Sequence, residues 1–187
     1  VKQHLLGFDR DNGRRLWSYK TDQSVAASTP TAVNGIIYFS SGNPRFVAAL
    51  RPGGGELEPP ATIWRTDGVG SGIASPLIYE GHVYIVDRSV AVCLDAGTGQ
   101  IVAKTRLTPS DATFYASPVA AGKTLFAVSR ESGVYTLSTA PDFKQLAHNT
   151  LDDGSVFNGT PAVHGGELLL RSDRYLYCIG EGQAQKQ

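Results

Sequence analysis

A short phrase recurs four times along the chain and constrains its fold more than any other feature. Each copy begins with Ser or Thr followed by proline, at Pro30, Pro76, Pro118 and Pro161. The prolines are therefore 46, 42 and 43 residues apart. Self-similarity at this period is typical of repeat proteins, in which one small unit buries its apolar surface by stacking on copies of itself.

Each copy predicts the same unit of four strands. A short apolar segment after the proline leads through a Gly turn into a second apolar segment, the pattern of a β-hairpin. The eighth residue after the proline is bulky in every copy: Tyr38, Tyr84, Phe126 and Leu169. Third strands are expected over Phe46–Leu50, Val90–Leu94, Gly133–Leu137 and Tyr175–Ile179. Fourth strands are expected over Arg15–Tyr19, Ile63–Arg65, Ile101–Arg106 and Lys144–Asn149.

Four short antiparallel strands per repeat, with no competing helical period, indicate an all-β fold: a β-propeller of four-stranded antiparallel blades. We expect one domain, a partial propeller spanning residues 1–187. Its blades are expected at about 1–22 (partial), 28–68, 73–108, 115–152 and 160–180 (partial). An alternative is a closed ring of four blades, in which Arg15–Tyr19 serves the last blade and Leu5–Asp9 is left over.

Charge and hydropathy exclude two classes of partner. Lys and Arg number 17, as do Asp and Glu, so the formal net charge is zero. A nucleic-acid surface needs a basic excess, and electrostatic docking to a membrane needs one too. No apolar run approaches the roughly 18–20 residues of a membrane helix. The sequence therefore predicts neither nucleic-acid binding nor a membrane span in this segment.

Aligning the third strands places a row of small residues at one position: Gly7, Ala49, Cys93, Thr136 and Cys178. One small residue per blade suggests close packing between sheets, so both cysteines are interpreted as small buried core residues. They belong to blades two apart, farther than the roughly 7 Å between Cα atoms that a disulfide allows. We expect no bond between Cys93 and Cys178.

A second motif joins the third strand to the fourth. It reads Asp9-x-x-x-Gly13-x-x-x-Trp17 near the N-terminus, and Asp95 and Gly99 keep the same spacing, with Ala103 in place of the tryptophan. Asp and Gly suit a tight turn, and tryptophan offers a flat apolar face for the neighbouring sheet. The residues predicted to dock the blades are Trp17, Trp64, Asp9, Gly13, Asp95 and Gly99.

This pattern resembles the repeat of the pyrroloquinoline-quinone (quinoprotein-like) β-propellers. The family includes dehydrogenases and cofactor-free members such as an outer-membrane assembly lipoprotein of bacteria. The resemblance implies a ring of seven or eight blades, of which this chain would be the C-terminal half. It also implies an extracytoplasmic location, periplasmic or secreted.

The residues themselves favour a binding or scaffold propeller over an enzyme. A quinoprotein dehydrogenase would need a calcium site, a catalytic Asp and often adjacent cysteines, and no such constellation is visible. The turn Asp9–Gly13 lacks the distant Glu of a calcium loop. We therefore expect no catalytic residue, metal or cofactor here, and partners that are proteins or small ligands. The alternative is a fragment of a pyrroloquinoline-quinone-dependent alcohol or sugar dehydrogenase, with quinone and calcium in the full-length protein.

Blade geometry suggests where a ligand would bind. If strands alternate in direction, the turns between second and third strands share one face with the loops between blades. Guanidinium groups and aromatic rings converging there would suit an anionic or peptide-like ligand. The opposing interpretation is that these charged residues merely solvate exposed hairpins. The candidate residues are Arg88, Arg130, Arg171, Tyr115, Phe157 and Asn158.

Overall fold

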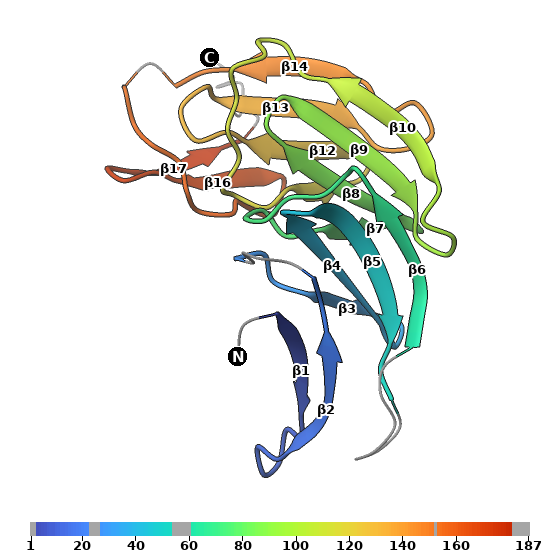
Figure 1. Ribbon diagram of the computed structural model, residues 1–187. Helices are drawn as coiled ribbons and strands as arrows, with labels where there is room; N and C mark the ends of the chain where they lie inside the picture. Colours follow the sequence, from blue (N-terminus) through green and yellow to red (C-terminus); the bar gives the residue numbers. More distant parts are fainter. Residues whose placement is uncertain (1–2, 23–26, 54–60, 152, 181–187) are drawn as a thin grey trace, which may run out of the picture.

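The computed structural model describes residues 3–22, 27–53, 61–151 and 153–180. These residues form seventeen strands in five antiparallel sheets, with no helix among them. In Figure 1 the sheets lie side by side in chain order along an open arc. The prediction of an all-β propeller built from four-stranded antiparallel blades is confirmed.

Three of the sheets are complete, with their strands hydrogen-bonded in chain order. The first of these contains β3 (Thr31–Val33), β4 (Ile36–Gly42), β5 (Arg45–Arg51) and β6 (Ala61–Asp67). The second contains β7 (Leu77–Tyr79), β8 (His82–Asp87), β9 (Val90–Asp95) and β10 (Ile101–Arg106). The third contains β11 (Val119–Ala121), β12 (Thr124–Val128), β13 (Val134–Ser138) and β14 (Gln145–Asn149).

Two incomplete sheets flank them. The N-terminal sheet is the pair β1 (His4–Phe8) and β2 (Arg15–Lys20). The C-terminal sheet has three strands, β15 (Ala162–His164), β16 (Glu167–Arg171) and β17 (Leu176–Ile179). Because β2 pairs with β1 and not with β17, the alternative of a closed four-bladed ring is wrong for the described residues.

The small residues of the third strands share one register, as expected. Cys93 lies between Tyr84 and Ala103, and Thr136 lies between Phe126 and Ala147. In the N-terminal pair, Gly7 lies opposite Trp17, and a Cβ on Gly7 would approach the Trp17 ring to 2.1 Å. The small side chain therefore makes room for a ring on the neighbouring strand of its own sheet. At Gly7, packing within the sheet therefore requires the small residue, whereas the sequence had suggested packing between sheets.

The two cysteines have different environments. Both are free, which confirms that Cys93 and Cys178 form no disulfide. Cys93 is fully buried, and burial raises the pKa of its thiol to about 11. Cys178 is exposed, so the expectation that it is a buried core residue is wrong. In the described residues, its three-stranded sheet has neither a fourth strand nor a following sheet to cover it.

The recurring Ser/Thr-Pro step links neighbouring sheets. The backbone N–H of Thr29 donates to the Ser75 hydroxyl at 2.8 Å. The N–H of Ser75 donates to the Ser117 hydroxyl at 2.9 Å, and that of Ser117 to the Thr160 hydroxyl at 3.1 Å. Proline has no N–H, so the residue before it carries the last donor ahead of the first strand. The repeated dipeptide thus forms a hydrogen-bond ladder across four sheets.

Candidate functional site

The Asp and Gly residues of the recurring motif form the same turn twice. The Asp9 carboxylate accepts hydrogen bonds from the backbone of Asp11 and Asn12, and the N–H of Gly13 donates to the Asp9 carbonyl. Gly13 and Gly99 have φ values of 72° and 73°, a left-handed conformation that favours glycine. These contacts give the turn its shape.

The second copy adds a side-chain hydrogen bond to the turn. The Asp95 carboxylate accepts hydrogen bonds from the backbone of Gly97 and Thr98, and the Thr98 hydroxyl donates to it at 2.9 Å. The bond from the Thr98 hydroxyl is the largest cause that lowers the pKa of Asp95.

The second turn receives the tryptophan of the preceding sheet. The Trp64 ring packs over Gly99, where a Cβ would approach it to 2.5 Å. The indole N–H of Trp64 donates to the Ala96 carbonyl at 2.9 Å. Thr66, two residues along β6, donates to the Gly99 carbonyl at 2.6 Å. Trp64 is 8% exposed, so most of its large apolar surface is removed from water, which stabilises the contact.

The next pair of sheets makes the equivalent contact, but the small residue lies on the fourth strand of the earlier sheet and the large one on the turn of the later sheet. Ala103 stands at the tryptophan position, and Phe143 stands at the turn position of Gly99. Phe143 is 2% exposed, and its ring centroid lies 5.5 Å from that of Tyr84. Ala103 packs against the cluster that contains both rings. The hydroxyl of Thr105 donates to the Phe143 carbonyl, as Thr66 does to Gly99.

Trp17 is the remaining predicted docking residue. Its ring covers Gly7 within its own sheet and is only partly buried. The turn that would receive it, by analogy with Trp64, lies between β5 and β6. Residues 54–60 of that turn are outside the described residues.

Three of the residues predicted for the ligand face come together. The Arg130 side chain donates to the Asn158 amide oxygen at 3.1 Å, and its guanidinium lies 4.9 Å from the centre of the Tyr115 ring. Backbone bonds hold the loops beneath them, because the Arg130 N–H donates to the Thr113 carbonyl and its own carbonyl accepts from the N–H of Phe157. The group joins the third complete sheet to the last one.

The other three predicted residues lie apart from this group. Phe157 is 5% exposed and packs with Leu170 in the core, so its ring is not on the surface. Arg88 is exposed in the turn between β8 and β9, with a φ of 52°. Arg171 is exposed at the end of β16. Charges on this face also pair across sheets, as in the 3.2 Å contact between Arg45 and Asp87.

The loop before the last sheet is held by one carboxylate. Asp153 accepts hydrogen bonds from the hydroxyls of Ser155 and Tyr177. These bonds lower the pKa of Asp153 to about 2. The Arg174 side chain donates to the Asp153 carbonyl at 2.9 Å. Beside this loop, Tyr175 in the turn between β16 and β17 is 57% exposed, and Leu176, the first residue of β17, is 71% exposed.

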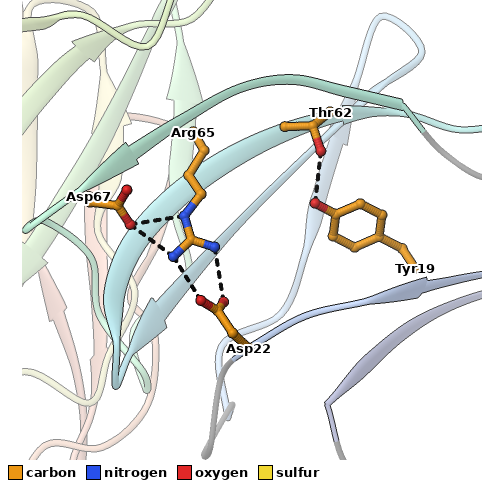
Figure 2. Close-up of polar contacts among 5 residues, drawn as sticks. All are labelled: Tyr19, Asp22, Thr62, Arg65 and Asp67. Atoms are coloured by element: carbon orange, nitrogen blue, oxygen red, sulfur yellow. Dashed lines mark hydrogen bonds and ion pairs between the residues drawn. The ribbon is translucent and has the colours of Figure 1, made fainter.

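A polar cluster around Arg65 was not predicted from the sequence. Figure 2 shows Arg65 lying between Asp22 and Asp67, while the Tyr19 hydroxyl meets that of Thr62 at 2.8 Å. Arg65 contacts both oxygens of Asp22, at 2.9 and 3.0 Å, and its guanidinium lies 3.9 Å from the centre of the Phe46 ring. The hydrogen bond from Arg65 lowers the pKa of Asp22.

This cluster could have been found by pairing complementary residues one repeat apart. Asp22 and Arg65 are 43 positions apart, as are Tyr19 and Thr62. The cluster joins the N-terminal pair of strands to the first complete sheet. Exposed ion pairs of this kind contribute little to stability.

The described residues do not fit the calcium site that a quinone cofactor of this repeat type would require. Within residues 3–22, 27–53, 61–151 and 153–180, no three His, Cys, Asp or Glu side chains cluster as metal ligands. The Asp9 and Asp95 carboxylates are occupied by turn N–H groups. The same part of the chain holds no helix able to cross a membrane.

Comparison with known proteins places these features in a family. A family model described as outer membrane protein assembly factor BamB matches residues 1–101 and 57–172. Among solved structures, BamB from Moraxella catarrhalis is similar, with a TM-score of 0.67 and 16% sequence identity over 92% of this chain. The chain spans 53% of that protein, about half its length. At this identity the likeness shows the fold.

A europium-containing methanol dehydrogenase matches 58% of this chain and 22% of its own length, with a TM-score of 0.47 and 19% identity. A search of curated proteins found no match. The family match covers most of the chain and agrees with the repeat and the blade geometry. This chain therefore belongs to the family of the outer membrane protein assembly factor BamB.

Proposed function

We propose that this chain is part of a non-catalytic scaffold propeller, and that it binds a protein partner of outer-membrane assembly outside the cytoplasm. Membership of a family described as an outer membrane protein assembly factor supports a role in that process. The blades supply a rigid frame, and the loops at one face supply the contact surface.

One observation carries the proposal: exposed aromatic and arginine side chains lie on loops that hydrogen bonds hold in place. Tyr115 and Arg130 form a cation–π contact, and Arg130 is fixed further by Asn158. Tyr175 and Leu176 are largely exposed beside the loop that Asp153 holds. Tyr and Arg are enriched among residues that dominate protein interfaces, because each adds contact area together with polar groups. A preorganised loop also loses less entropy on binding.

The chemistry of the same face fits recognition better than catalysis. Two of its carboxylates are engaged in structure, Asp153 with two hydroxyls and Asp173 with the N–H of Val156. Arg130 meets an amide oxygen and an aromatic ring, and Arg45 meets a carboxylate. These arrangements suit a peptide surface with acidic and apolar groups.

The proposal is tested with purified soluble domains of the outer-membrane assembly machinery from the same organism. Binding is measured by biolayer interferometry for the wild-type chain and for Tyr175→Ser combined with Leu176→Ser. We expect the double variant to weaken binding at least tenfold. Arg130→Ala should weaken it less, since Arg130 also has partners within the chain.

Leu146→Ser provides the matched control, because Leu146 is 52% exposed on β14, away from these loops. It should leave binding unchanged. Equal loss in the control and the double variant, or full binding by the double variant, would show that this face is not the contact surface. Reduction of a dye by the wild-type chain with added pyrroloquinoline quinone, calcium and an alcohol would contradict the non-catalytic role.

A further inference from the structure

Successive sheets have equivalent positions at the start of the third strand and at the end of the fourth. In the N-terminal pair, the N–H of Thr21 donates to the Gln3 carbonyl at 2.8 Å. In the first complete sheet, the N–H of Gly68 donates to the Arg45 carbonyl at 2.9 Å. The register of the third and fourth strands extends the comparison to the next sheet. The equivalent positions at which charge differs are Gln3 and Arg45, Asp22 and Val69, Arg65 and Lys104, and Asp67 and Arg106.

Between the N-terminal pair and the first complete sheet, the chain balances its own positive charge. Arg65 contacts Asp22 and Asp67, each at 2.9 Å. One carboxylate comes from the earlier sheet and the other from the strand of Arg65 itself. The arginine at this position therefore has two anionic partners within the chain.

Between the first and second complete sheets, both of these carboxylates are replaced. Val69 stands in place of Asp22, and Arg106 stands in place of Asp67. Lys104 keeps the cation of the fourth strand, and a further cation comes from the third strand of the earlier sheet. A cavity of about 420 Å³ lies here, lined by Arg45, Gly68, Val69, Val90, Val92, Lys104, Thr105 and Arg106.

The chain balances only part of the positive charge around this cavity. Arg45 contacts Asp87 at 3.2 Å and donates to the Gly70 carbonyl at 3.4 Å. The side chains of Lys104 and Arg106 are exposed and have no ion-pair partner in the described part of the chain. A hollow lined by charges of one sign attracts ligands of the opposite sign, because its walls focus the electric field.

We propose that this cavity binds an acidic segment of a polypeptide, whose carboxylates supply the counter-charge that Asp22 and Asp67 supply at the preceding interface. The proposal rests on the proposed function in that the segment belongs to a protein partner of this face. Lys104 and Arg106 are two residues apart on β10, so they share one face of the strand and lie roughly 7 Å apart.

The same spacing separates carboxylates on alternate residues of an extended peptide. Arginine can bind a carboxylate through two parallel hydrogen bonds, which favours this anion geometrically. Val69, Val90 and Val92 add apolar walls, against which the methylene groups of acidic side chains can pack. A segment with acidic residues at alternate positions therefore fits both the charge and the shape of the cavity.

The experiment measures the binding of a blocked, fluorescein-labelled peptide of alternating glutamate and serine to the full chain by fluorescence anisotropy. Wild type should give saturable binding that weakens as salt is added. A peptide with glutamine in place of glutamate has the same size without the charge. A peptide with the same number of glutamates at every third position has the charge with another spacing. Both should bind at least tenfold more weakly.

Variants of the cavity locate the site. Lys104→Gln combined with Arg106→Gln should weaken binding at least tenfold. Arg51→Gln combined with Lys144→Gln is the matched control, since it removes the same two charges from exposed positions outside the cavity; it should leave the affinity unchanged.

Arg106→Asp is a second, single variant. It places beside Lys104 the carboxylate that Asp67 places beside Arg65, so the chain would then supply its own counter-charge. This variant should also weaken binding of the glutamate peptide at least tenfold. Unchanged affinity in both cavity variants would overturn the proposal.

Three other results would overturn the proposal as well. They are equal affinity for the glutamate and glutamine peptides, equal losses in the cavity and control variants, and equally tight binding of inorganic phosphate, which would mark a general anion site. The peptide assay contains no partner protein, so its failure leaves the proposed function standing. Peptide binding by a wild-type chain that binds no assembly domain would contradict the proposed function alone.

Discussion

The two complete interfaces between sheets reach the same packing by opposite means. At the first, the earlier sheet contributes the large ring of Trp64 and the later turn contributes Gly99. At the second, the earlier sheet contributes Ala103 and the later turn contributes Phe143. The threonine two positions along the fourth strand donates to the carbonyl of the turn in both. The repeat therefore preserves the combined volume at the interface, together with one hydrogen bond, whichever side supplies the ring.

The largest expected effect comes from deleting either ring. Trp64→Ala and Phe143→Ala should each lower the free energy of unfolding by roughly 3–5 kcal/mol, because each leaves a cavity between sheets. Chemical denaturation followed by far-UV circular dichroism measures the change. Val102→Ala, at a side chain 46% exposed on β10, should change stability little. If only the tryptophan substitution matters, the two interfaces are not equivalent.

A tryptophan at the second interface should be harmful in wild type. Ala103→Trp introduces a ring where Phe143 already fills the space, and overpacking costs typically about 1–3 kcal/mol. Ala147→Trp, at the equivalent position of the next sheet, should not destabilise the chain, because Ala147 is exposed. Thermal denaturation of the two variants compares them directly. A similar loss at both positions would mean that Phe143 does not account for the effect.

The repeat spacing predicted most strands closely, because turn residues and alternating apolar segments recur in fixed order. The strand predicted over Ile63–Arg65 was too short, because β6 spans Ala61–Asp67. The repeat that contains β6 is the longest, with 46 residues from Pro30 to Pro76, so the start of β6 could not be aligned. The sequence did not predict that Phe143 supplies the ring opposite Ala103, because this depends on which residues meet across two sheets.

The candidate site was only partly predictable for the same reason. Tyr115, Arg130 and Asn158 were placed on one face by strand direction alone, and they meet. Phe157 was placed there too, yet its ring turns inward beside Leu170, since a loop position does not fix the direction of a side chain. Asp22 and Arg65 were missed because residues one repeat apart can be paired only once the contacting edges of the sheets are known.

Each hydrogen bond of the ladder should contribute a small and similar amount to the free energy of unfolding. Ser75→Ala removes the hydroxyl that accepts the N–H of Thr29, and Ser117→Ala removes the one that accepts the N–H of Ser75. Each should lower the free energy of unfolding by about 1 kcal/mol. Ser18→Ala, at an exposed position of β2, is the control. A loss at one step only would show that the ladder is not a repeated element.

The smallest effect concerns the turn that receives Trp64. Hydrogen bonds from Thr98 lower the pKa of Asp95 below its usual 3.8. A depressed value in the folded state means that the turn is stabilised above about pH 3.8 and loses this contribution as the pH falls through the folded pKa. Thr98→Val should move the pKa of Asp95 back towards 3.8, measured by NMR titration of the carboxyl carbon. An unchanged value would show that the backbone N–H groups alone lower it.

The most direct test of shared volume between sheets is a double-mutant cycle at the second interface. Phe143→Gly added to Ala103→Trp rebuilds the Trp64–Gly99 arrangement there, and glycine suits the φ of 38° at position 143. We predict that the double variant unfolds at a higher denaturant concentration than either single variant, with a favourable coupling energy. A double variant no more stable than the sum of the two single changes would contradict the account.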